Sequence, residues 1–198
     1  ASRGVIPQVR LSWQVVISLT NSMKAQAAGR LERLRNAAAE NGIRTFLVRD
    51  TASIEWLTAF DDVFDDEQAH ALLVTPHDAV LHTDSRYSGA ARKAAQGEGV
   101  IAVDDARQGH GEWVADVFTR RHAAAPAGSP APESIVLGIE DSMTLAAFRA
   151  LEGALAKAPA SPQLRETSDF VRMLRAVKEP SEVARMKAAQ AITDAAFS

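Results

Sequence analysis

Cysteine is absent from the 198-residue chain, and its absence excludes several kinds of site. Without a thiol there can be no disulfide framework, no thiolate zinc site and no cysteine nucleophile. A chain without cysteine suits the reducing cytoplasm, so we expect a cytoplasmic protein.

Excess positive charge and long apolar runs are also lacking. Lysine and arginine total 22 against 25 aspartate and glutamate residues, and the resulting net charge of −3 gives no attraction toward nucleic acid or an anionic membrane. No apolar run approaches the ~20 residues of a membrane-spanning helix. We therefore expect no nucleic-acid partner and no membrane association. The hydrophobic share of 46% is sufficient for the core of one globular domain.

The first 23 residues stand apart from the rest. Two arginines and the apolar run at 11–19 imitate a signal peptide, but polar residues interrupt that run. Alternatively, Met23 is a natural start preceded by an extension. We expect residues 1–23 to be an amino-terminal extension of uncertain structure.

Beyond this extension, the pattern predicts alternating helices and strands. Short apolar runs predict strands at 43–49, 69–75, 79–83, 100–103 and 135–139. Apolar periodicity and capping residues predict helices at 24–41, from Asp84 or Ser85 to about 96, at 112–121, around 145–155, at 169–177 and from 180 to 197. The Pro76-His77-Asp78 turn joins two of the strands as a hairpin. This alternation indicates an α/β domain of three layers, with a mixed β-sheet flanked by helices.

Several side chains are expected in the core or at an interface. The buried stripe of the helix at 145–155 should carry Leu145, Phe148, Leu151 and Leu155. The aromatic and apolar side chains expected to be buried elsewhere, or to lie in an interface, are Trp13, Trp56, Trp113, Val117 and Phe118.

Two motifs carry a family resemblance. Residues 51–60 read Thr-Ala-Ser-Ile-Glu-Trp-Leu-Thr-Ala-Phe, which looks like a short helix. They precede an acidic loop and the hairpin, which ends in Thr-Asp-Ser-Arg-Tyr at 83–87. This order resembles the amino-terminal domain of the creatinase, prolidase and aminopeptidase P family, where Asn-Ile-Xaa-Tyr-Leu-Thr-Gly-Phe precedes a hairpin ending in Thr-Asp-Xaa-Arg-Tyr. Residues 175–183 and the helix that follows resemble the family's junction with its catalytic domain. Ala59 departs from the pattern, because glycine would permit a tight turn there.

The resemblance implies a domain organisation. A creatinase-type, ribonuclease H-like domain would cover 24–177, and 178–198 would begin the linker helix toward an absent catalytic domain. In the family, that catalytic domain holds two divalent metal ions, which we expect to be manganese. Its ligands are two aspartates, a histidine and two glutamates, none of which has a matching position here. The resemblance therefore implies no catalytic residue and no metal ligand in this chain, which alone should be inactive.

The resemblance also implies partners for the parent protein. That protein would be a homodimeric Xaa-Pro aminopeptidase or Xaa-Pro dipeptidase acting on proline-containing peptides. Because the family's corresponding loop can lean over a neighbouring subunit's active site, Asp61, Asp62 and Phe64 are implied to control substrate access. A solvated acidic loop is the simpler interpretation, since the spacing at 61–67 lacks the alternating residues of a calcium loop.

Other candidates have ordinary structural explanations. His82 and Asp84, with His77 across the turn, are possible metal ligands, but a metal site needs three or four converging donors. A solvated hairpin and a helix cap explain these residues adequately without a metal. Arg86 and Tyr87 could in principle reach a ligand. We expect instead that Arg86 lies beside Asp84 and that Tyr87 packs under the sheet.

Two other functions stay open. One is a peptide-binding or histone-binding module of the same fold, like the corresponding domain in the large subunit of a histone chaperone, with basic peptides meeting the acidic loop. The other is the amino-terminal domain of a creatinase-like amidinohydrolase.

Overall fold

The structure is a computed structural model that describes residues 13–61, 63–65, 67, 69–95, 99–124, 135–158 and 161–197, with side chains from Met23 onward. Its helices and strands follow in the order α1 (Trp13–Glu40), β1 (Thr45–Val48), α2 (Thr51–Thr58), β2 (His70–Val74), β3 (Ala79–Thr83), α3 (Ser85–Ala94), β4 (Ala102–Asp104), α4 (His110–Ala124), β5 (Val136–Glu140), α5 (Leu145–Leu155), β6 (Gln163–Thr167), α6 (Phe170–Ala176) and α7 (Pro180–Ala196).

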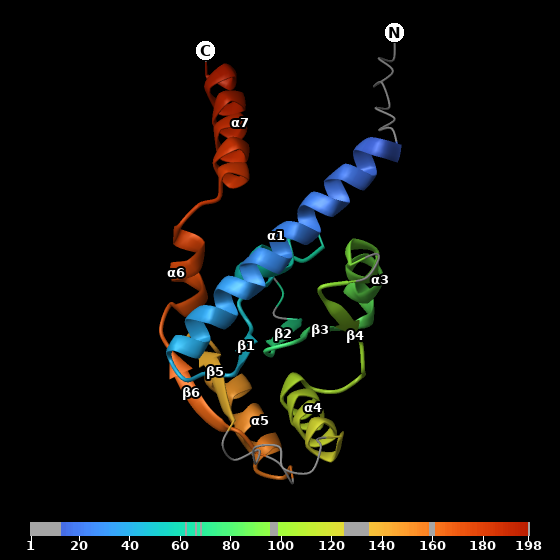
Figure 1. Cartoon of the computed structure of the whole chain (residues 1–198), viewed down its shortest axis with the longest axis vertical. Helices are drawn as coiled ribbons and strands as arrows, with labels where there is room; N and C mark the ends of the chain where they lie inside the picture. Colours follow the sequence, from blue (N-terminus) through green and yellow to red (C-terminus); the bar gives the residue numbers. More distant parts are fainter. Residues whose placement is uncertain are drawn as a thin grey trace.

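One mixed sheet organises the domain. Its six strands lie in the order β4-β3-β2-β1-β5-β6, and β2 is antiparallel to both neighbours while the other pairs are parallel. Successive strand residues face opposite sides, so Phe46 packs into one core and Leu47 into the other. Helices α1, α2, α3 and α6 contribute to the first core, and α4 and α5 cover the second face (Figure 1). The predicted three-layer α/β fold with a mixed sheet is confirmed.

The predicted hairpin and helix caps are present. The turn at 76–78 joins β2 to β3, with Thr75 N–H donating to the Asp78 carbonyl at 2.9 Å. The Asp84 side chain accepts from Arg86 N–H at 2.8 Å and caps α3. These short polar side chains satisfy backbone groups that would otherwise lack partners.

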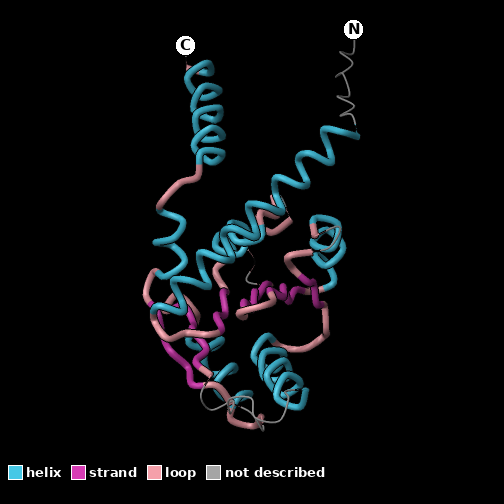
Figure 2. The backbone as a smooth tube through the Cα atoms, viewed as in Figure 1, coloured by secondary structure: helices cyan, strands magenta, loops and turns pink. Residues whose placement is uncertain are grey.

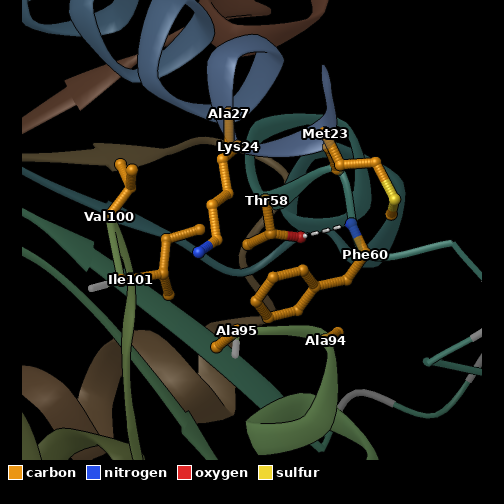
Figure 3. A pocket seen from close by; sticks show the side chains of 11 residues that line it. Met23, Lys24, Ala27, Thr58, Phe60, Ala94, Ala95, Val100 and Ile101 are labelled. Atoms are coloured by element: carbon orange, nitrogen blue, oxygen red, sulfur yellow. Dashed lines mark hydrogen bonds between the residues drawn. The ribbon is translucent and has the colours of Figure 1, made fainter. Parts of the chain in front are cut away.

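The turn after α2 forms with alanine where the family has glycine. Ala59 ends α2 in the left-handed region, with φ 54° and ψ 30°. The backbone N–H of Phe60 donates to Thr58 Oγ1 at 3.3 Å, across this turn (Figure 3). Phe60 then packs toward Ala94 and Ala95 beside a cavity of about 20 Å³, which is room for one water at most. The local hydrogen bond and the packing hold a conformation that alanine disfavours by roughly 1 kcal/mol.

Three expectations about elements were wrong. Helix α1 begins at Trp13 and not near residue 24. Strand β6 has no counterpart in the prediction, because its sequence Gln-Leu-Arg-Glu-Thr contains one apolar residue and its edge position leaves most side chains exposed. Leu145 is 62% exposed, since it lies at the start of α5 while Leu151 and Leu155 face the core.

Candidate functional site

The acidic loop after α2 is held by partners from distant parts of the chain. Asp61 pairs with Arg185 of α7 at 3.1 Å, and Glu67 pairs with Arg86 of α3 at 2.7 Å. Asp65 accepts from the Tyr87 hydroxyl at 2.5 Å. The loop is exposed as expected, but its described carboxylates are engaged rather than simply solvated.

The bond between Tyr87 and Asp65 changes the acidity of both groups. The donated hydrogen bond stabilises the carboxylate and lowers the pKa of Asp65. The same bond raises the pKa of Tyr87 to about 12. Arg86, with Asp84 and Glu67 both at 2.7 Å, has a raised pKa because those hydrogen bonds stabilise its charge. Arg86 lies beside Asp84 as predicted.

The predicted substrate-access residues are held in different ways. Asp61 is exposed and faces α7, whereas Phe64 is half-buried with its ring 4.5 Å from the His70 ring and 6.3 Å from Phe60. Asp62 lies outside the described residues. The structure thus places Asp61 and Phe64 on one loop, and their part in substrate access stays a prediction.

His70, which no sequence pattern indicated, is the buried centre beneath this loop. Its side chain is fully buried, and Nδ1 lies 2.8 Å from Thr83 Oγ1. Nε2 has no hydrogen-bond partner among the described residues, and the Tyr87 ring lies edge-on at 4.7 Å. Burial lowers the pKa of His70, because an imidazolium would lose its hydration there. His70 begins an apolar strand, so its neighbours in sequence give no sign of its role.

His82 is buried against α4 and is not part of a solvated hairpin, so that interpretation was wrong. Its ring stacks on Trp113 with centroids 4.7 Å apart, and its Nε2 donates to the Ala106 carbonyl at 3.0 Å. Its Nδ1 lies 2.7 Å from His110 Nδ1. Because a neutral His82 carries its proton on Nε2, Nδ1 accepts from His110.

The other proposed ligands do not join His82. Asp84 caps α3, and His77 is exposed in the turn. Within the described residues, no three histidine, aspartate or glutamate side chains are placed to hold a metal ion.

The junction before α7 is fastened to the domain. The buried Arg30 donates from Nη1 to the Trp56 carbonyl at 2.7 Å and from Nη2 to Glu179 at 2.9 Å. Trp56 Nε1 donates to Glu182 at 3.1 Å, and Glu182 also accepts from the Glu179 N–H at 2.9 Å. Trp56 is therefore an interface aromatic between α2 and the junction, as predicted.

Comparison with known proteins decides the family. A model of the creatinase/prolidase N-terminal domain matches residues 30–177, most of the chain. The chain belongs to this family. No curated protein sequence matches it significantly.

Solved structures share the creatinase/prolidase fold. An Xaa-Pro dipeptidase from Bacillus anthracis is 29% identical with a TM-score of 0.62, and the match covers 86% of this chain and 42% of that chain. An XXA-pro aminopeptidase from Streptococcus pyogenes is 23% identical with a TM-score of 0.58, covering 76% of this chain and 98% of that chain. An X-Pro aminopeptidase from Thermotoga maritima is 21% identical with a TM-score of 0.55, and the match covers 78% of this chain and 38% of that chain. The chain thus spans less than half of the dipeptidase.

In this creatinase/prolidase domain, the carboxyl ends of the parallel strands gather acidic residues, as at many ligand sites. Here each serves the backbone or a neighbouring side chain. Asp50 caps α2, Asp104 accepts from Trp113 Nε1 at 3.0 Å, and Glu140 accepts from the N–H groups of Arg49 and Asp50 at 2.9 and 3.3 Å. Burial raises the pKa of Glu140, which opposes a carboxylate charge. These donors do not fit a pair of divalent metals.

Acid should destabilise the domain through the half-buried His110. Burial, followed by the positive charge of Arg49, lowers the pKa of His110 to about 3, and the carboxylate of Asp84 opposes this shift. The unfolded chain therefore binds more protons below the ordinary histidine pKa of 6.5. We expect the free energy of unfolding to fall by about 1.4 kcal/mol per pH unit for His110 alone as pH drops from 6.5 toward 4. Urea unfolding at several pH values measures the slope.

Two variants test whether His110 causes this pH dependence of the free energy of unfolding. His110→Asn retains a donor for His82 and should flatten the slope by about one proton. His77→Gln, in the exposed turn, should leave the slope of the free energy of unfolding against pH as in the wild type. An unchanged slope in His110→Asn would contradict the assignment.

Proposed function

We propose that this chain is the non-catalytic amino-terminal domain of an Xaa-Pro metallopeptidase, an aminopeptidase or a dipeptidase of the cytoplasm. Its role is to pair subunits and to narrow access to the active site for proline-containing peptides. The observation that carries the proposal is the match to the B. anthracis Xaa-Pro dipeptidase, which takes in 86% of this chain but only 42% of that protein. The creatinase/prolidase assignment supports it.

The surface of α7 supports a further packed domain. Val183, Met186 and Phe197 share one side of the helix, and Ile192 lies on the opposite side, all of them exposed. Figure 2 shows α7 extending away from the sheet. A helix that is apolar on opposite sides is typical of one packed from more than one direction. In the proposal, a catalytic domain covers this helix and provides the two metal ions.

None of the helices in the described residues combines the length and the hydropathy that crossing a bilayer requires.

Catalytic silence is the first test. The 198-residue chain, incubated with manganese and with Xaa-Pro dipeptides and tripeptides, should release no amino acid and retain no stoichiometric metal after dialysis. An intact Xaa-Pro dipeptidase provides the positive control. Metal-dependent hydrolysis by this chain would refute the non-catalytic role. Sequencing the reading frame beyond Ser198 provides a second test, since the proposal expects the ligand order Asp, Asp, His, Glu, Glu there.

Substrate access is tested in the longer protein. Replacing Asp61, Asp62 and Phe64 should raise KM for Xaa-Pro peptides with little change in kcat, because these side chains would touch the substrate's amino end. Asp105→Asn, which breaks an exposed ion pair with Arg92, is the matched control. An unaltered KM and peptide selectivity would contradict the role.

The ion pair to α7 needs its own control. Arg185→Gln removes the partner of Asp61 but retains the carboxylate. If Asp61 itself meets substrate, Arg185→Gln should change KM less than Asp61→Asn does. Equal effects would instead indicate that the pair acts by positioning the loop.

A further inference from the structure

A groove of about 860 Å³ is lined by residues of α4 and α5. These two helices lie on the face of the sheet opposite α1 (Figure 1). Small residues from both helices form the floor of the groove, among them Gly111, Ala115, Ala150 and Gly153. A Cβ placed at Gly111 would lie 2.8 Å from the Ala150 carbonyl oxygen, so the two helices are in close contact at the groove's base. The groove therefore has a low floor between two walls of longer side chains.

The walls carry opposite charges. Glu112 and Asp116 are four residues apart on α4, and Arg149 and Lys157 are eight apart along α5 and its end, so each pair lies along one side of its helix. All four side chains are exposed. In the described part of the chain they form no ion pair, although arginine–carboxylate pairs are common elsewhere on this surface.

We infer that this groove is the face through which two copies of the chain associate about a two-fold axis. A two-fold interface brings the same surface patch together with itself, so the patch must be complementary to its own copy. One acidic wall beside one basic wall meets this condition when the two-fold axis runs along the groove, because that rotation places the α4 carboxylates of each copy against the α5 cations of the other.

Other occupants fit this charge pattern less well. A basic protein would be repelled by Arg149 and Lys157, and an acidic one by Glu112 and Asp116. The inference rests on the subunit pairing in the proposed function and names the surface that performs it.

Complementary charge reversals test the arrangement. One variant carries Glu112→Lys and Asp116→Lys, and the other carries Arg149→Glu and Lys157→Glu. In light scattering after gel filtration and in sedimentation equilibrium, the wild type should be a dimer that weakens as salt is added. Each variant alone should dissociate at least about tenfold more readily, because like charges then face each other.

Mixing the variants restores opposite charges at every contact. The mixture should form a one-to-one heterodimer, and the chain with all four reversals should form a homodimer again. Glu152→Lys with Glu166→Lys changes the net charge as much as the α4 reversal does, at exposed positions outside the groove lining, and should leave the dimer intact. Far-ultraviolet circular dichroism verifies that each variant is folded.

The outcomes separate the surface from the pairing. If neither charge reversal weakens the dimer, subunit pairing is supported but the groove is not the surface through which the subunits pair. Reversed variants that fail to pair when mixed would overturn the two-fold arrangement. A wild-type chain that is monomeric at every salt concentration would overturn both, while the hydrolysis tests above would still decide the peptidase assignment.

Discussion

Gly111→Ala should lower the free energy of unfolding by about 2–3 kcal/mol, although alanine is a better helix former than glycine. The added Cβ would lie 2.8 Å from the Ala150 carbonyl oxygen and 2.9 Å from Leu151 Cα, both of which are backbone atoms. No side chain can rotate away, so α5 must move off α4. That movement opens the core around the fully buried Trp113 and separates it from Leu151.

Gly153→Ala is the matched control. Gly153 also lies in a helix, on the facing α5, and a Cβ added there would have nothing within 4 Å. We expect this substitution to stabilise the protein by up to about 1 kcal/mol through helix propensity alone. Urea unfolding of both variants at one protein concentration measures the difference. A Gly111→Ala protein as stable as Gly153→Ala would show that α4 and α5 are not tightly packed.

Sequence patterns predicted the elements whose signals are local. The order of helix, hairpin and capped helix through 51–94 depends on short-range features, such as Asp84 as a cap and the proline turn. Strand β6 escaped prediction because it pairs only with β5 at the sheet's edge and is mostly exposed, so burial imposes no apolar pattern on it. Local chemistry thus predicted elements better than it predicted the edge of the sheet.

The candidate site was harder to predict because its contacts join distant residues. Asp61 was identified as one of several loop acids, but its partner Arg185 lies 124 positions later. His82 was expected at the end of a solvated hairpin strand, whereas its environment is made by Trp113 and His110 from α4. Only tertiary packing decides whether such a polar residue is solvated or buried.

The second large effect concerns the attachment of the junction to the domain. Arg30→Met should reduce the free energy of unfolding by about 3 kcal/mol, because Arg30 is only 2% exposed and its guanidinium donates hydrogen bonds to both the Trp56 carbonyl and Glu179. Methionine fills the volume of the stem but leaves the Trp56 carbonyl without this donor and removes the buried charge that faces Glu179. Urea unfolding, followed by tryptophan fluorescence, measures the change.

Arg33→Met separates burial from charge in this attachment. Arg33 pairs with the same Glu179 at 2.6 Å and stacks over the same Trp56 ring, with its guanidinium carbon 5.0 Å from the ring centroid, as Arg30 does. Its side chain is 37% exposed against 3% for Arg30, so water screens its interaction and its loss should cost about 1 kcal/mol or less. If burial sets the strength of the attachment, the loss in the free energy of unfolding must be several-fold larger for Arg30→Met than for Arg33→Met. Equal losses would mean that exposed charge, and not the buried fork of Arg30, fixes α7 to the domain.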